Sequence, residues 1–182
     1  ITVLHANAQV GGFPTSSASA GWAKILDANI HGVINTVQHF VARMKCSRSF
    51  IVITASTAAF DADPMWGAAY NVSQAAIKVF AEQLAHDLKH DKDCKASAHR
   101  LVPGVRQGSS ATEDEVWQPL GRQTASFTAA YALKKLESGC FYIVCSDPGP
   151  GLNIGAGQWT FEDVFSNRAA LSRWDDEYKQ SY

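Results

Sequence analysis

The chain has 182 residues, a formal net charge of −1 and 46% hydrophobic residues, and its acidic and basic residues are mixed along its length. This size predicts a single domain over residues 1–182, and this hydrophobic content can bury a core, which excludes a disordered chain. The balanced charge argues against a nucleic-acid or membrane partner. No apolar run reaches the roughly 20 residues that a membrane span needs, so we expect a cytoplasmic protein.

The first part of the chain reads as a strand followed by a long helix. Residues 1–6 are short, apolar and β-branched, which is typical of a buried parallel strand. After polar turns, apolar residues recur at helical spacing from Trp22 to Met44, which predicts a helix over 20–44. Asn29 lies inside this helix, where asparagine is unfavourable, so we expect a specific reason for its presence.

A second strand, residues 50–55, ends at Ser56, and an unusual loop over residues 60–67 follows it. The loop holds Asp63 and Trp66, and it is open to two interpretations. The carboxylate next to a proline is ordinary turn chemistry and the indole can cover the core, or both side chains can face a bound substrate. We favour the second, because the loop joins Ser56 to Tyr70, where the next helix begins.

The rest of the chain continues the alternation of helices and strands. It contains a helix over 69–89, a strand over 96–102 that ends at Pro103-Gly104-Val105, one or two helices over 112–136, a last strand over 139–145 and a polar helical tail over 159–182. This alternation predicts an α/β fold with a doubly wound parallel sheet. A sheet that began at Ile1 would carry an unpaired edge in its middle, so we expect further sequence before it.

The cysteines do not form a metal-binding pattern. There are four, with no Cys-x-x-Cys pair among them: Cys46, Cys94, Cys140 and Cys145. The ligand spacing of a structural zinc site is therefore missing, and we predict reduced thiols and no metal.

Ser56 at a strand end and Tyr70 at a helix start resemble the active site of the short-chain dehydrogenase/reductase family. In that family the serine and tyrosine flank the substrate carbonyl, and a lysine one helical turn after the tyrosine lowers its pKa. Position 74 of this chain, where that lysine would stand, is Gln74. The resemblance implies a Rossmann-like fold of which the present residues form the second half.

Other stretches carry the same resemblance. Ala6-Asn7-Ala8-Gln9 is similar to the family's Asn-Asn-Ala-Gly turn without its final glycine, and Asn29 takes the place of the asparagine that the family ties to an active-site water. The resemblance implies an NADP(H) cofactor, whose glycine-rich pyrophosphate turn would lie in a preceding segment; NAD in place of NADP is left open. The implied cofactor contacts are Asn7, Ala8, Tyr70, Gln74, Pro103, Gly104 and Val105.

Gln74 changes the expected chemistry. A tyrosine pKa near ~10 makes a poor proton relay, and Lys78, eight residues after Tyr70, is rotated roughly 80° from that tyrosine around the helix. With the Asp63–Trp66 loop and a tail that looks like fungal family members, the chain resembles the reductase-derived Diels–Alder cyclases of fungal prenylated indole alkaloid biosynthesis, the malbrancheamide and paraherquamide type. That resemblance implies iminium reduction followed by cyclisation.

In this hypothesis Asp63 stabilises a cationic substrate and Trp66 shapes it, while Ser56, Tyr70 and Asn29 complete the catalytic set. Two alternatives stay open. One is a conventional NAD(P)H-dependent ketone or alcohol oxidoreductase, in which Lys78 or a water replaces the lost lysine. The other is a catalytically inactive subunit. The family also pairs its two long helices across a twofold axis, which implies a homo-oligomer, either a dimer or a tetramer.

Overall fold

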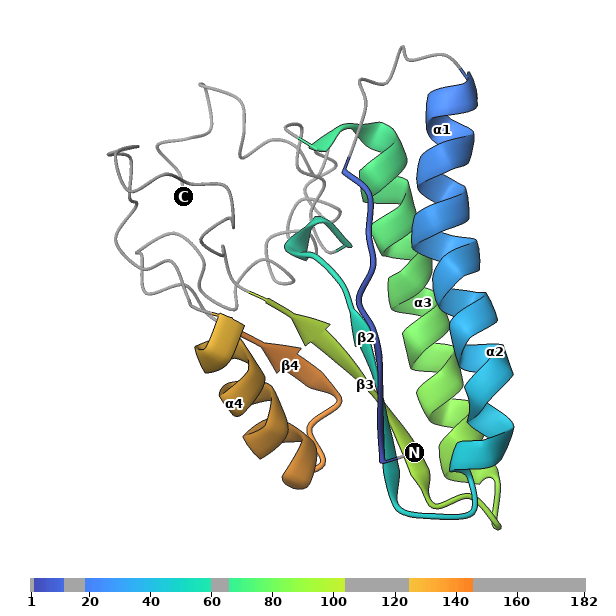
Figure 1. Cartoon of the computed structure of the whole chain (residues 1–182), viewed down its shortest axis with the longest axis vertical. Helices are drawn as coiled ribbons and strands as arrows, with labels where there is room; N and C mark the ends of the chain where they lie inside the picture. The colour runs from blue at the N-terminus through green and yellow to red at the C-terminus, as the bar shows by residue number, and fades with distance from the viewer. Residues whose placement is uncertain (1, 12–18, 60–65, 104–124, 146–182) are drawn as a thin grey trace, which may run out of the picture.

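Four parallel strands form the centre of the molecule (Figure 1), and the computed structural model describes residues 2–11, 19–59, 66–103 and 125–145. The strands are β1 (Val3–Ala6), β2 (Ser49–Thr54), β3 (Ala96–Val102) and β4 (Tyr142–Val144). They lie in the order β1-β2-β3-β4, and each is parallel to its neighbour. Their carboxyl ends therefore meet at one edge of the sheet, which is where open α/β sheets bind ligands.

Helices cover both faces of this sheet. Between β1 and β2 the chain forms α1 (Ser19–Leu26), the π-helical turn η1 (Asp27–His31) and α2 (Gly32–Met44). Between β2 and β3 it forms the short 3-10 turn η2 (Thr57–Ala59) and α3 (Ala68–His90), and α4 (Ala125–Glu137) precedes β4. Figure 1 shows α1, α2 and α3 on one face and α4 on the other. This arrangement confirms the predicted α/β class.

The predicted elements are found with small shifts in their ends, but the prediction of a buried first strand is wrong for the described residues: β1 lies at the edge of the described sheet, and within it only Ala6 is buried. The main differences are that η1 divides the helix predicted over 20–44 and that β4 is shorter than the strand predicted over 139–145. The strand is shorter because Gly139, with φ at 76°, closes the end of α4 and donates its N–H to Leu136 O at 3.0 Å. The helical tail predicted over 159–182 lies outside the described residues, as does the first part of the helices predicted over 112–136.

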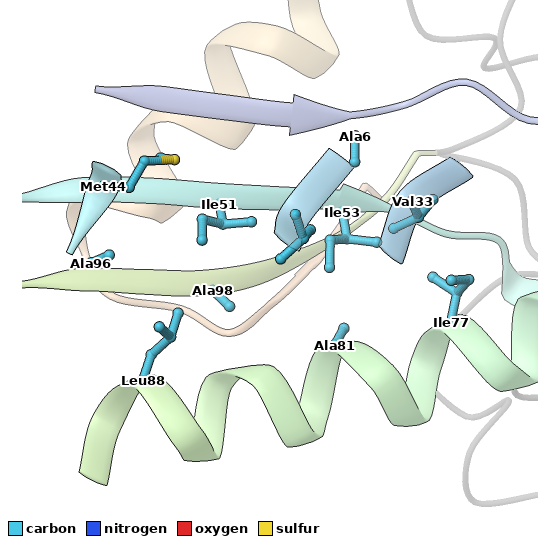
Figure 2. Packing of buried hydrophobic residues seen from close by; sticks show 11 residues of the cluster. Ala6, Val33, Met44, Ile51, Ile53, Ile77, Ala81, Leu88, Ala96 and Ala98 are labelled. Atoms are coloured by element: carbon cyan, nitrogen blue, oxygen red, sulfur yellow. The ribbon is translucent and has the colours of Figure 1, made fainter. Parts of the chain in front are cut away.

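Alternation along the strands builds two separate cores. Ile51 and Ile53 of β2 are both fully buried against α2 and α3, where Figure 2 shows them facing Ile77 and Ala81. Val52, between them, points to the other face and joins the cluster under α4. Full burial of one such aliphatic side chain stabilises the fold by about 1.5–3 kcal/mol. The period-two pattern of β2 thus holds helices on both faces.

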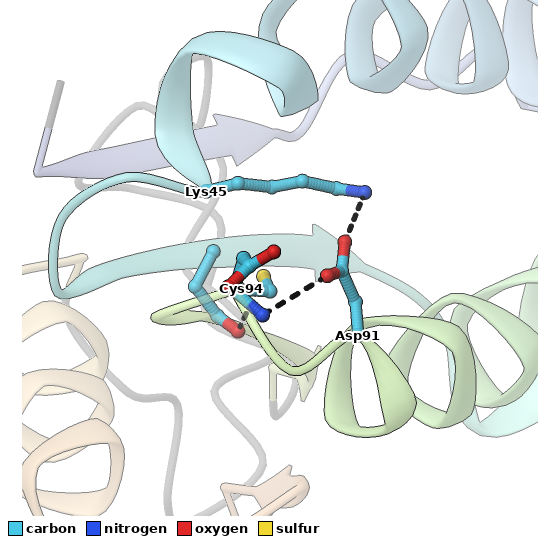
Figure 3. A network of polar contacts seen from close by, with 5 residues as sticks. Lys45, Asp91 and Cys94 are labelled. Atoms are coloured by element: carbon cyan, nitrogen blue, oxygen red, sulfur yellow. Dashed lines mark hydrogen bonds and ion pairs between the residues drawn. The ribbon is translucent and has the colours of Figure 1, made fainter.

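An ion pair ties α2 to α3 at the amino ends of β2 and β3 (Figure 3). Lys45 Nζ donates to Asp91 Oδ2 at 2.7 Å. Cys94 N donates to the backbone carbonyl of Asp91 at 3.0 Å. The hydrogen bond to Asp91 raises the pKa of Lys45, and the same bond lowers the pKa of Asp91. Lys95 N also donates to Lys45 O at 2.7 Å, so this end of the sheet is closed by both side chains and backbone.

The part of the chain that the structure describes was searched for membrane-spanning helices, disulfides and groups of metal ligands. None of its helices is both long and apolar enough to cross a bilayer. All four cysteines are free thiols, and Cys145 alone among them is buried. No group of three histidine, cysteine or acidic side chains comes together in these described ranges.

Candidate active site

Ser56 lies two residues after the end of β2, at the carboxyl edge of the sheet. The ladder continues to its neighbour, since Ala55 N donates to Leu101 O at 2.8 Å. Ser56 Oγ accepts a hydrogen bond from Ala58 N at 3.2 Å and so caps the turn η2. The side chain is half-buried, and its position is determined by the strand end and the turn together.

Gln74 faces this strand end from α3. Its side chain is fully buried, and Gln74 Oε1 accepts a hydrogen bond from Ser56 N at 3.0 Å. The amide nitrogen, Gln74 Nε2, is also buried and has no hydrogen-bond partner among the described residues. The side chain at this position therefore holds the backbone of Ser56 and keeps one donor open.

Tyr70 stands at the start of α3 and is nearly covered. Its ring is 8% exposed, and its hydroxyl donates to Gln9 Oε1 at 3.3 Å. Trp66 lies beside it, with ring centroids 5.3 Å apart and planes 33° apart, and remains 48% exposed. Gly67, with φ at 76°, makes the turn between the two aromatic residues, a conformation that favours glycine. Trp66 and Tyr70 form an aromatic wall whose outer part meets solvent.

Asn29 has the specific reason that its place in a helix predicts. It lies in the π turn η1 and is 1% exposed. Its amide makes two hydrogen bonds to the backbone of Val10: Val10 N donates to Asn29 Oδ1 at 2.7 Å, and Asn29 Nδ2 donates to Val10 O at 3.1 Å. Asn29 Nδ2 also donates to Ser73 Oγ at 2.9 Å. One amide therefore joins the turn after β1, the π turn and α3. The role of this residue toward a water stays a prediction.

The remaining predicted residues divide into those at the sheet edge and those outside the described part. Asn7 and Ala8 follow β1 and are exposed, and Pro103 follows β3 and is half-buried. They thus share the carboxyl edge with Ser56. Asp63, Gly104 and Val105 lie outside the described residues, so their predicted roles have no geometry to report.

A hollow of about 330 Å³ opens on the α4 face of the sheet. Two of the predicted cofactor contacts, Asn7 and Pro103, line it, together with a mostly apolar wall. Thr128 of α4 also lines it, and its hydroxyl is buried without a hydrogen-bond partner in the described ranges. The other lining residues are Val3, His5, Val52, Leu101, Ala125, Ala129, Ala132, Leu133 and Leu136.

Arg100 contacts the candidate site, and the sequence interpretation did not single it out. It is fully buried on β3, and its Nη2 donates to the carbonyl oxygen of Ser56 at 3.2 Å. Its guanidinium carbon lies 5.7 Å from the centre of the Tyr142 ring. The alternation along β3 could have identified it. Arg100 lies an even number of residues from Ala96 and Ala98 and so shares their side of β3, the side packed against α2 and α3, where a charged side chain must be buried.

Acidic and phenolic groups surround this buried cation. The Tyr142 hydroxyl donates to Glu82 Oε1, and Lys78 Nζ pairs with the same oxygen at 2.8 Å. Burial lowers the pKa of Arg100, with Tyr142 and Glu82 opposing that shift. Burial and the bond to Glu82 raise the pKa of Tyr142 to about 12. Burial raises the pKa of Glu82, but the hydrogen bonds from Lys78 and Tyr142 outweigh it and leave that pKa lowered.

Comparison with protein families decides the assignment. Residues 1–115, well over half of the chain, match the model of the family described as short chain dehydrogenase. The chain belongs to the short-chain dehydrogenase family. This is a family of oxidoreductases, and the result confirms the resemblance seen at Ser56 and Tyr70. A search of curated proteins found no match.

Solved structures of dehydrogenases share this fold. A short-chain dehydrogenase/reductase from Burkholderia phymatum in complex with NAD is similar with a TM-score of 0.76 and 23% identity, over 93% of this chain and 68% of that one. A short-chain dehydrogenase from Burkholderia cenocepacia in complex with NADP gives 0.69 and 21%, over 94% and 69%. An alcohol dehydrogenase from the archaeon Thermococcus sibiricus, complexed with 5-hydroxy-NADP, gives 0.66 and 17%, over 84% and 66%. The chain spans about two thirds of their length.

Proposed function

We propose that this short-chain dehydrogenase is a nicotinamide-dependent reductase that acts on a cyclic iminium and then directs an intramolecular Diels–Alder closure, as in fungal prenylated indole alkaloid biosynthesis. The observation that carries the proposal is that Gln74 occupies the position of the family's lysine. The side chain there is a neutral amide, fully buried, whose oxygen holds Ser56 N. No ammonium at this position lowers the pKa of Tyr70, so the site favours a substrate that needs no proton on oxygen.

An iminium is such a substrate. Its carbon is already activated by the positive nitrogen, and the product is a neutral amine without any protonation step. Lys78, the residue that could have replaced the lost lysine, has its ammonium paired with Glu82 at 2.8 Å. This pairing weakens the carbonyl route, because Glu82 engages the Lys78 ammonium one helical turn after position 74.

The aromatic wall suits a flat, cationic substrate. Trp66 and Tyr70 present two rings 5.3 Å apart, and Trp66 is half exposed toward solvent. Indole and phenol faces attract a cation and pack against planar rings, at about 0.5–2 kcal/mol for a cation over a ring. In the proposal Asp63 adds a carboxylate beside the cation, a role that follows from its place in the loop between Ser56 and Trp66.

The described residues fit a nicotinamide cofactor. Gln74 Nε2 is a buried donor without a partner in the described ranges, and Asn7, whose Oδ1 accepts a hydrogen bond from Thr54, is an exposed residue at the same sheet edge. Asn7, Ala8, Tyr70 and Gln74 would hold the cofactor, together with the Pro103–Val105 turn. When bound, it supplies the hydride that the iminium carbon accepts. NADP(H) is our first candidate, with NAD(H) as the alternative.

A conventional ketone or alcohol oxidoreductase is the second candidate. It is favoured by one observation, which is that Ser56 and Tyr70 are both present at the positions that the family uses, with Tyr70 held at the start of α3. The two candidates differ in their need for Tyr70. A carbonyl oxygen requires a proton from the phenol, whereas an iminium does not.

Substrate panels on three variants test the proposal. NADPH and NADH oxidation is followed with a dihydroisoquinolinium salt and with a set of ketones, and melting temperature is measured on the same samples. We expect iminium turnover that survives in Tyr70→Phe and falls at least about tenfold in Asp63→Asn. Trp66→Ala should loosen stereoselectivity. If Tyr70→Phe is inactive while Asp63→Asn retains full activity on ketones, the conventional candidate replaces this one.

The proposal includes a homodimer or a dimer of dimers. Val72 and Val79, seven residues apart on α3, are 49% and 62% exposed and lie on one side of the helix. A second copy that packs against this side would remove both from water. Light scattering should give a multiple of the 19.7 kDa chain, and Val79→Glu should lower that mass. A wild-type monomer at working concentration would contradict this part of the proposal.

A further inference from the structure

Gln9 occupies a place in the site that neither the family resemblance nor the proposed function assigns. Its amide spans the gap between the sheet and α3. Gln9 Nε2 donates to Thr54 O at 2.7 Å, and Gln9 Oε1 accepts the hydroxyl hydrogen bond of Tyr70 at 3.3 Å. Both ends of this half-buried side chain are therefore used, one on the last residue of β2 and one on the phenol.

The sheet end of this bridge is firmly held. Thr54 is 5% exposed, and its hydroxyl donates to Asn7 Oδ1 at 2.9 Å while its Oγ1 lies 2.7 Å from His5 Nε2. The residue after Gln9 is held as well, because Asn29 bonds both the N–H and the carbonyl of Val10. Gln9 is thus fixed through its own amide and through its neighbour in the chain.

The other side of Tyr70 is closed by Trp66. A Cβ on Gly11 would lie 3.5 Å from Trp66 Cζ3, so the indole rests against the turn that carries Gln9 as well as against the phenol. Tyr70 is accordingly held between Gln9 at its hydroxyl and Trp66 at its ring. A substrate that uses the phenol proton has to displace the Gln9 oxygen.

We propose that Gln9 is a specificity-determining residue, which engages the Tyr70 hydroxyl and so disfavours substrates that need the phenol proton. The amide oxygen bonds the neutral form of the phenol, whereas the family's lysine favours the ionised form. Gln9, through its contact with the Tyr70 hydroxyl, and Gln74, through the absence of an ammonium at position 74, then act in the same direction. This inference rests on the proposed function for its link to substrate choice, and on geometry alone for its link to Tyr70.

A four-variant cycle tests it: wild type, Gln9→Gly, Gln74→Lys and the double variant. Gln83→Ala is the matched control, since the Gln83 amide donates to exposed Asp87 at 2.7 Å and is remote from the site. The first measurement is the NMR signal of tyrosine Cζ, labelled with carbon-13 and assigned through Tyr70→Phe. The second is ketone reduction with NADPH, which serves as the carbonyl readout.

We expect Gln9→Gly to shift the Tyr70 signal and to leave the Tyr142 signal in place, and Gln83→Ala to shift neither. Gln9→Glu keeps the acceptor but loses the donation to Thr54 O, so its Tyr70 signal should stay closer to that of wild type than the Gln9→Gly signal. Ketone reduction by the double variant should exceed the sum of the two single variants by at least about tenfold. If Gln9→Gly fails to fold, Gln9→Asn, whose side chain is too short to reach Tyr70, replaces it.

Two results would overturn the inference. One is a Tyr70 signal that does not respond to removal of the Gln9 amide. The other is ketone reduction by Gln74→Lys alone that equals that of the double variant. The NMR measurement requires neither cofactor nor turnover. A shifted Tyr70 signal together with no iminium reduction would therefore reject the proposed function while leaving the Gln9–Tyr70 contact established.

Discussion

The two ends of the sheet hold their helices by different interactions. At the amino ends, α2 and α3 are joined by the partly exposed ion pair of Lys45 and Asp91. At the carboxyl ends, the uncharged amides of Gln9, Asn29 and Gln74 and the buried guanidinium of Arg100 make cross-element contacts. Salt and water can replace an exposed ion pair, but a buried polar group that loses its partner has no substitute. The geometry of the candidate site therefore depends on hydrogen bonds made by buried side chains.

The largest effect is expected from Asn29→Ala. This change removes both hydrogen bonds to Val10 and the one to Ser73 inside a site that is 1% exposed. We expect a loss of roughly 2–4 kcal/mol in the free energy of unfolding, because each buried group left without a partner costs about 1–3 kcal/mol. Urea denaturation measures it. Asn35→Ala, an exposed asparagine of α2, is the control, and equal losses in the two variants would contradict the role of Asn29.

Arg100→Met tests the one buried charge that we find at the carboxyl end of the described sheet. The Ser56 carbonyl loses the donor at 3.2 Å, so the free energy of unfolding should fall by about 1–3 kcal/mol. Because the group is fully buried, the loss should be nearly independent of salt. Arg100→Lys keeps the charge without the planar fork and should recover only part of it. A loss that disappears in high salt would show that Arg100 acts as a surface charge.

A smaller and pH-dependent effect is expected at Tyr142. Burial and the hydrogen bond to Glu82 raise its pKa to about 12, above the value near ~10 of an unfolded chain. The folded protein then keeps a proton that the unfolded chain loses, so this contribution is complete below pH ~10 and is lost as the pH rises through about 12. Ultraviolet titration of the phenolate should show the late step. Glu82→Gln should move it earlier, and Tyr142→Phe should remove it.

The smallest effect is expected from Lys45→Met. The pair with Asp91 is partly exposed, so its contribution should shrink with added salt. Lys45 lowers the pKa of Asp91, so the contribution is present above the unfolded carboxyl pKa near ~3.9 and is lost as the pH falls through the lowered value. A double-mutant cycle with Asp91→Asn at low and high salt isolates the term. A coupling energy between Lys45 and Asp91 that does not change with salt would contradict the difference drawn between the amino and carboxyl ends of the sheet.

The sequence predicts the fold well because the fold depends on local patterns. Period-two alternation in β2 and helical spacing in α2 and α3 are each contained within one segment of the chain. The places of Ser56, Tyr70 and Asn29 were also predictable, since they stand at a strand end, a helix start and an unfavourable helix position, and their roles in a reaction stay predictions. The contacts that bind the site together join residues far apart in the chain, such as Gln9 with Tyr70 and Arg100 with Ser56. No local pattern records such a contact, so Gln9 and Arg100 were missed as site residues.

The π turn constrains how this chain can change in length. A π turn contains one residue more than an α turn, so η1 is an insertion absorbed within a helix. Successive helical residues are separated by about 100° around the axis. Deleting one residue from Asp27–His31 would rotate α1 by that angle relative to α2 and carry Ile25, which is fully buried, away from its packing. Substitution at exposed positions 27 and 31 does not change the rotation of α1 relative to α2. Homologous chains that keep the Asn29 contact should therefore vary in residue type here and stay constant in residue number.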